Sequence, residues 1–165
     1  MKLKELVCIN ENINIDEYIE FRELVKENMS YPEWLGDFSK KDLVNLLNND
    51  AKIWIYYLDK EPVCSMMLIP ADEMALSKFE IDLNYKDVAD YGPMFVNRKY
   101  VGNGFQYQML QTLDEYCINN KYKYAAGTIH PDNVYSIHNL LKDGFEFKNT
   151  KTFNRGIRNI YLKRL

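Results

Sequence analysis

Apolar residues recur at helical spacing in three long stretches of the chain. These stretches predict amphipathic helices over residues 15–28, 103–119 and 133–142. A further helix is predicted to begin at residues 39–42, where Ser and Asp form an acidic version of a capping box. The residues expected on the apolar faces of these helices are Tyr18, Phe21, Leu24, Val25, Leu43, Leu46, Leu47, Phe105, Met109, Leu113, Tyr116, Cys117, Ile137, Leu140 and Leu141.

Shorter apolar runs predict β-strands. The runs expected to be strands cover residues 3–9, 53–58, 62–69, 93–96, 122–129, 145–153 and 157–165. Turn residues predict antiparallel hairpins around 59–61 and 154–156, whereas residues 70–90 mix helical and alternating patterns that do not decide between helix and strand. A strand–helix–strand unit between hairpins indicates an α+β fold whose mixed sheet is parallel at its centre.

Composition indicates one globular domain over residues 1–165, with 47% hydrophobic residues and a net charge of −3. The negative charge argues against a non-specific partner such as nucleic acid or an anionic membrane. No stretch approaches the ~20 apolar residues of a membrane span, and no signal peptide is evident, so we expect a cytoplasmic protein. Cys8, Cys64 and Cys117 are too scattered for a zinc site or a disulfide framework and are expected to be buried free thiols.

Two glycines, Gly102 and Gly104, stand where the strand over 93–96 passes into the long helix. Glycine lets the backbone bring its N–H groups close to a ligand, and the helix start adds a partial positive charge. This combination suits a pyrophosphate, and Arg98 and Lys99 add charge nearby. A tight turn without a ligand is the alternative. A dinucleotide-binding fingerprint is excluded because Tyr107 occupies the third glycine position, and no P-loop Lys-Ser or Lys-Thr follows.

The second half of the chain resembles the GCN5-related N-acetyltransferase family between Pro93 and Phe147. The resemblance is carried, in order and spacing, by Val96, Tyr100, Gly102, Asn103, Gly104, Asn133, Ser136, Gly144 and Phe145. The family signature is Arg or Gln, two residues, Gly, one residue, and Gly or Ala. Lys99, Gly102 and Gly104 match it with Lys in the first position. Read from Val101 instead, the signature keeps only Gly104.

The resemblance implies a mixed, split central β-sheet flanked by helices, and acetyl-CoA as co-substrate with no metal. The pantetheine arm would pair with the backbone of Met94, Phe95 and Val96 in the split. The pyrophosphate would bind the N–H groups of a six-residue turn, which consists of Val101, Gly102, Asn103, Gly104, Phe105 and Gln106. Asn133 would contact the pantetheine or help to position the thioester.

The catalytic residues are less well defined by the resemblance. The family often places a tyrosine acid where this chain has Leu140, so Tyr135 is the candidate acid, with a packing or surface tyrosine as the alternative. Asp90 is the candidate base, with a plain loop aspartate as the alternative. Tyr31 and Trp34 fall in a region that lines the acceptor site in this family, although core packing explains them equally well. A metal or triad role for His130-Pro131-Asp132-Asn133 is disfavoured against a simple turn.

The predicted function is transfer of acetyl from acetyl-CoA to the amine of a small molecule or peptide. One alternative is an acyl-CoA-binding module of the same fold with weak catalysis, and another is a transferase for longer acyl chains. The net negative charge slightly favours a cationic acceptor, and the family often forms homodimers.

Overall fold

The computed structural model describes residues 1–165 and contains one eight-stranded mixed sheet. The strand order is β1-β2-β3-β4-β6-β8-β7, and β5 pairs separately with β3. The strands are β1 (Val7–Ile9), β2 (Lys52–Leu58), β3 (Glu61–Pro70), β4 (Val88–Tyr91), β5 (Phe95–Val96), β6 (Tyr124–Ile129), β7 (Glu146–Phe153) and β8 (Gly156–Arg164). Only β4 and β6 pair in parallel. The predicted α+β class, with a parallel centre between hairpins, is therefore confirmed.

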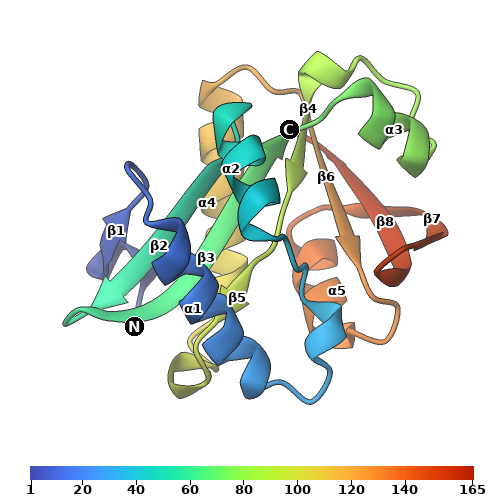
Figure 1. Ribbon diagram of the computed structural model, residues 1–165. Helices are drawn as coiled ribbons and strands as arrows, with labels where there is room; N and C mark the ends of the chain where they lie inside the picture. Colours follow the sequence, from blue (N-terminus) through green and yellow to red (C-terminus); the bar gives the residue numbers. More distant parts are fainter.

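Helices cover both faces of the sheet. They are α1 (Ile15–Glu27), α2 (Lys40–Asn48), α3 (Glu73–Phe79), α4 (Phe105–Asn119) and α5 (Val134–Lys142). Figure 1 shows α1 and α2 in front of β2 and β3, with α4 behind them. The largest apolar cluster joins α4 to the back of the sheet through Met109, Leu110 and Leu113, and a second cluster joins α1 and α2 to the front through Phe21 and Leu43.

Local signals account for the helix starts and the first hairpin. The Asn14 side chain accepts hydrogen bonds from the first turn of α1, and Ser39 and Asp42 form the predicted capping box of α2. Asp59 and Lys60 have φ angles of 47° and 70°, as the tight turn between β2 and β3 requires. These elements were predictable because their signals lie within a few residues of one another.

The structure corrects several boundaries. The predicted strand over residues 3–9 is a 3₁₀ turn, Leu3–Glu5, followed by the three residues of β1. Residues 70–90 form α3, a 3₁₀ turn and β4, while only Phe95–Val96 of the predicted 93–96 strand pairs as β5. Of the side chains expected to be buried, Leu24, Leu141 and Cys8 are exposed. Leu24 and Leu141 are the outward members of otherwise well-buried helix faces, and Cys8 lies on the edge strand β1.

None of the helices has both the length and the apolar character that a membrane span requires.

Candidate active site

A bulge between β4 and β5 opens the sheet. Phe95 follows Tyr91 by four positions, whereas their β3 partners Ser65 and Leu68 are only three positions apart. The β4–β5 segment therefore carries one extra residue relative to β3, which defines a β-bulge. β4 pairs with β6 as far as Gly127, and beyond that point β5 pairs only with β3. The sheet is split between β5 and the last residues of β6 (Figure 1).

The edge of β5 that faces the split has unpaired backbone groups. The Asn97 N–H donates to the Val63 C=O (2.8 Å), which fixes the alternation along this antiparallel ladder. That alternation directs the backbone groups of Phe95 toward β3 and those of Met94 and Val96 toward the split, where no strand meets them. The three residues expected to contact pantetheine thus lie along this edge, and two of them offer free groups for strand-like pairing.

Six consecutive backbone N–H groups, from Gly102 to Tyr107, have no acceptor within the protein. Three precede α4, and the other three belong to the first turn of that helix, where intrahelical partners are always missing. The Val101 N–H differs because it donates to the Arg98 C=O (3.4 Å). The unpaired run therefore begins one residue later than the predicted pyrophosphate turn and continues one residue beyond Gln106.

The two glycines shape this turn. Gly102 and Gly104 have φ angles of +96° and +69°, a region that residues with a Cβ rarely adopt. A Cβ added at either position would meet no atom within 4 Å, so the space over the turn is open. The positive end of α4 faces the same space. The turn therefore has the open surface, free donors and favourable charge of an anion site.

Side-chain hydrogen bonds hold the turn in place. The Gln108 side chain donates to the Asn103 C=O (3.0 Å). The Gln106 side chain donates to the Ser136 hydroxyl (2.9 Å) and accepts from the Asn139 amide (2.8 Å), which ties α4 to α5. Gln106 therefore positions the turn through its side chain, while its backbone N–H stays free.

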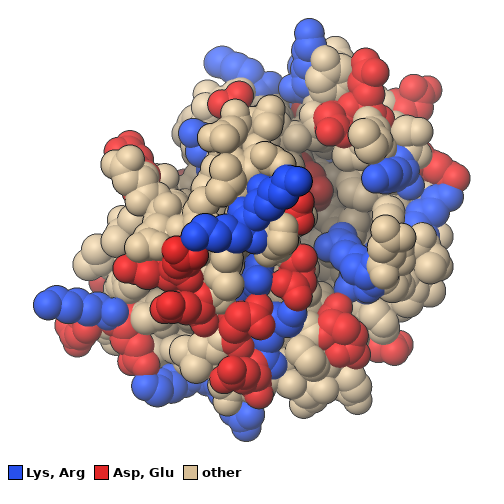
Figure 2. Space-filling model, in the orientation of Figure 1, with Lys and Arg blue, Asp and Glu red and all other residues tan.

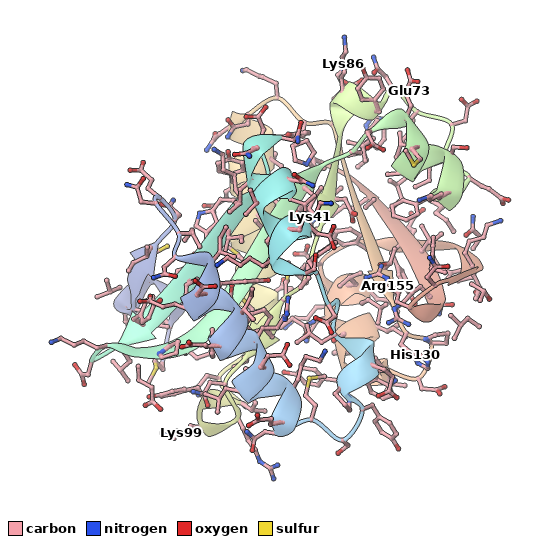
Figure 3. All side chains as sticks on the ribbon, viewed as in Figure 1. Lys41, Glu73, Lys86, Lys99, His130 and Arg155 are labelled. Carbon is pink, nitrogen blue, oxygen red and sulfur yellow. The ribbon has the colours of Figure 1, made fainter.

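Arg98 and Lys99 direct their charges away from the free N–H groups. Lys99 forms an ion pair with Glu61 at the start of β3, and Arg98 Nη1 donates to the Asn28 C=O at the end of α1 (3.4 Å). Figure 3 shows Lys99 on the loop that precedes the turn. The free donors at the turn are therefore its backbone N–H groups rather than these two side chains.

The start of α5 holds the other predicted site residues on this side. The Asn133 side-chain oxygen caps α5 by accepting from the Ser136 N–H (3.2 Å), so only its amide N–H₂ remains free for a ligand. Tyr135 is 58% exposed in the first turn and has no side-chain partner. Leu140 is buried and lies 3.4 Å from the position that a Cβ on Gly127 would occupy. Leu140 is thus part of the packing between α5 and β6.

Asp90 lies on β4 next to the opening of the split. It pairs with Ala126 of β6, and its neighbours Ala89 and Tyr91 point into the core behind the sheet, so Asp90 faces the front. Burial raises the pKa of its carboxyl to about 7, and the positive charge of Arg155 opposes this rise. A carboxyl with this pKa is half ionised near neutrality, which suits a general base.

An aromatic stack borders the front of the split. Trp34 stacks on Tyr31 (ring centroids 4.5 Å apart) and on His130 (5.3 Å), which joins the loop between α1 and α2 to the loop after β6. The stack places Trp34 and Tyr31 beside the end of β6, in the region where an acceptor was expected to bind. His130 belongs to this wall, and the structure has no cluster of three or more potential metal ligands.

Arg155 completes the wall from the turn between β7 and β8. Its Nη2 donates to the Thr128 hydroxyl (2.6 Å), on the part of β6 that pairs with β8 but extends beyond its pairing with β4. A Cβ added to Gly36 would lie 3.0 Å from Pro93 Cγ and 3.4 Å from Arg155 Nη1, so the loop between α1 and α2 passes close to both. Figure 3 shows Arg155 and His130 beside the open end of β6.

Comparison with solved structures identifies the fold. The acetyltransferase of the GNAT family from Streptococcus pneumoniae superposes with a TM-score of 0.71 at 13% identity, over 97% of this chain and 99% of that one. This chain has the fold of the GNAT acetyltransferases. The fold implied by the resemblance between Pro93 and Phe147 is therefore confirmed over nearly the whole chain.

Two further neighbours were determined with ligands. AAC(6')-Ib in complex with paromomycin and acetyl-CoA aligns with a TM-score of 0.69 at 16% identity, over 96% of this chain and 93% of that one. RimL, a ribosomal L7/L12 alpha-N-protein acetyltransferase in complex with CoA, aligns with a TM-score of 0.67 at 13% identity, over 96% and 94%. No protein-family model and no curated protein matches the sequence.

Sequence reasoning missed Arg155 and Thr128. Arg155 was noted only as part of a hairpin turn, and no local pattern marks either residue. Their approach depends on the register of β6 against β8, which pairs Thr128 with Ile160. A tertiary pairing of this kind leaves no signal in the spacing of neighbouring residues.

Proposed function

We propose that this protein is an acetyl-CoA-dependent N-acetyltransferase that acts on the amine of a small molecule or peptide. The observation that carries the proposal is the combination of a split sheet with six free N–H groups at the start of α4. The open space over Gly102 and Gly104 fits a pyrophosphate, and the free edge at Met94 and Val96 fits an extended amide-containing arm. The free amide of Asn133 is the proposed third contact.

Asp90 is the proposed general base. An alkylamine has a pKa near 10, so little of it is neutral at pH 7, and a nearby base must take its proton. When bound, acetyl-CoA supplies an activated acetyl group: the amine nitrogen forms a C–N bond to it, the C–S bond breaks, and the amine proton passes to Asp90. The pKa of about 7 lets Asp90 accept that proton near neutrality.

The free N–H groups along the β5 edge are proposed to stabilise negative charge that develops on the acetyl oxygen. Tyr135 is the proposed proton donor to the thiolate and reaches solvent freely. Its contribution is expected to be small, because a thiol pKa of about 8.5 makes the thiolate a weak base that leaves without obligatory protonation.

The enzyme proposal is favoured over a catalytically weak binding module. Asp90 lies on the front of the sheet with a raised pKa, and a site that only binds acyl-CoA does not need such a group. The solved neighbours include an aminoglycoside complex and a protein N-terminal acetyltransferase, so the same fold serves both small-molecule and peptide amines.

The test combines binding and turnover. Acetyl-CoA is expected to raise the melting temperature, and mass spectrometry is expected to detect an acetylated product in a panel of amines. Gly104→Trp is expected to abolish the thermal shift because the indole would fill the open space over the turn. The absence of a thermal shift with any CoA ester would contradict the proposal. Binding without turnover of any amine would favour the binding module instead.

A further inference from the structure

Arg155 is held on the acceptor side of the split. Thr128 lies two residues beyond Ala126, the β6 partner of Asp90, and therefore points to the same face of the sheet as Asp90. Two residues of a strand span about 6.6 Å. The hydrogen bond from Arg155 Nη2 to Thr128 thus holds the guanidinium on the same face of the sheet as Asp90, two residues farther along and beside the split.

No carboxylate forms an ion pair with this part of the wall, although the charges of Asp90 and Glu33 act on it over a longer distance. Arg155 and the buried Arg158 donate only to neutral oxygens: the Thr128 hydroxyl, the Ile157 C=O and the Glu33 C=O. Neither guanidinium forms an ion pair. Burial lowers the pKa of Arg158, the positive charge of Arg155 lowers it further, and the charge of Glu33 opposes the shift. Two neighbouring cations of this kind create a site that favours an anion.

Basic side chains also lie on the surface near Arg155. Figure 2 shows the front of the molecule hollowed between α2 and the β7–β8 hairpin, with basic side chains on the hairpin side. Acidic side chains gather mainly over α1, which contributes Asp16, Glu17, Glu20, Glu23 and Glu27, and a smaller acidic group lies just below the hollow. The negative net charge of the chain therefore does not describe the wall at Arg155.

We propose that Arg155 binds a carboxylate of the acceptor, so that the substrate is an α-amino acid with an apolar side chain. This inference rests on the proposed acetyl transfer and specifies its substrate class. The planar guanidinium of Arg155 can form paired hydrogen bonds to a carboxylate. Its Nη1 lies close to Gly36, in the loop between α1 and α2 that also carries Trp34. The stack of Tyr31, Trp34 and His130 offers aromatic ring edges for the side chain. The amine would then lie toward Asp90.

The experiment compares L-phenylalanine with L-phenylalaninamide, which differ only in the carboxylate. The ratio of their kcat/KM values with acetyl-CoA is measured for the natural protein and for Arg155→Gln in the same buffer, so that the different amine pKa values cancel. The natural protein is expected to prefer the acid, and Arg155→Gln is expected to reduce that preference about tenfold or more. Arg164→Gln, at the exposed end of β8, is the charge-matched control and should leave the ratio unchanged.

A direct binding measurement tests the role of Arg155 independently of the proposed acetyl transfer. Saturation-transfer NMR of each ligand with the CoA-bound protein is expected to detect the acid and not the amide. Acetylation of both compounds with a ratio insensitive to Arg155→Gln, or a preference for spermidine or kanamycin, would overturn the inference and leave acetyl transfer intact. Failure to acetylate any amine despite acetyl-CoA binding would overturn both.

Discussion

At the scale of single residues, Asp90 is the position where stability and function oppose each other. Its carboxyl has a pKa of about 7 in the fold, compared with its ordinary value of 3.8. The folded protein therefore binds a proton between these pH values that the unfolded chain releases. Stability conferred by the neutral form is full below about pH 4 and is lost as the pH rises to about 7.

Asp90→Asn should therefore be more stable and less active than the natural protein. At pH 8 we expect the free energy of unfolding to rise by about 1–2 kcal/mol, since asparagine avoids a buried charge. We expect kcat/KM to fall about 10²-fold, because no base remains. Urea denaturation and an acetylation assay measure the two effects. A stable variant with full activity would exclude Asp90 as the base.

The pH profile provides a separate test of the same residue. The rate with a given amine should rise as the pH increases through about 7, because the carboxylate form of Asp90 accepts the proton. This limb should vanish in Asp90→Asn. Arg155→Gln should shift the limb to higher pH, since the Arg155 charge holds the pKa of Asp90 down. A shift to lower pH would contradict the electrostatic account.

Gly102 and Gly144 allow two effects of a glycine substitution to be distinguished: backbone strain and loss of ligand binding at the turn. Gly102 and Gly144 have nearly the same φ, +96° and +94°, but Gly144 follows α5 and lies away from the turn. Both Gly102→Ala and Gly144→Ala should lose about 1 kcal/mol of stability. Only Gly102→Ala should also weaken acetyl-CoA binding, measured by calorimetry. Equal affinities for the two variants would contradict the assignment of the turn.

At the scale of elements, one buried charge cluster joins α4, the end of α5 and β8. Lys163 forms ion pairs with Asp114 and with Asp143 (3.0 Å to the latter), and the Tyr91 hydroxyl donates to Asp114 (2.7 Å). Burial raises the pKa of Asp143 to about 6. The cluster fixes the helix that carries the proposed anion-binding turn against the strand that carries the candidate base.

Removing the cation should destabilise this junction strongly. Lys163→Met leaves two largely buried carboxylates without a cationic partner, and we expect a loss of about 3 kcal/mol in the free energy of unfolding. Lys148→Met, which breaks the exposed pair with Glu146, should cost less than about 0.5 kcal/mol. Urea denaturation compares the variants at pH 8. Similar losses in both would show that the cluster contributes no more than a surface pair.

Local signals explain what could be predicted at this scale. Caps such as Asn14 and the Asp59–Lys60 turn act over a few residues, so their elements were found. The four residues of β4 were not assigned, because their strand character comes from pairing with β3 and β6 rather than from their own alternation. The same reason hid Arg155, whereas Gly102 and Gly104 marked the turn directly.

At the scale of the whole molecule, the split between β5 and β6 and the turn before α4 together form the proposed acetyl-CoA site. The β-bulge opens the split and leaves one edge of β5 free, and the same chain then runs directly into the free N–H groups of the turn. The two features are only a few residues apart in the sequence, so one extended ligand can reach both.

An amide NMR titration with acetyl-CoA shows whether one ligand contacts both features. We expect saturable shifts of the amide signals of Met94 to Val96 and of Gly102 to Tyr107, with α3 (Glu73–Phe79) unaffected. Gly104→Trp should abolish the shifts in both segments together. Saturable binding that leaves both segments unchanged, or no binding at millimolar acetyl-CoA, would contradict the account.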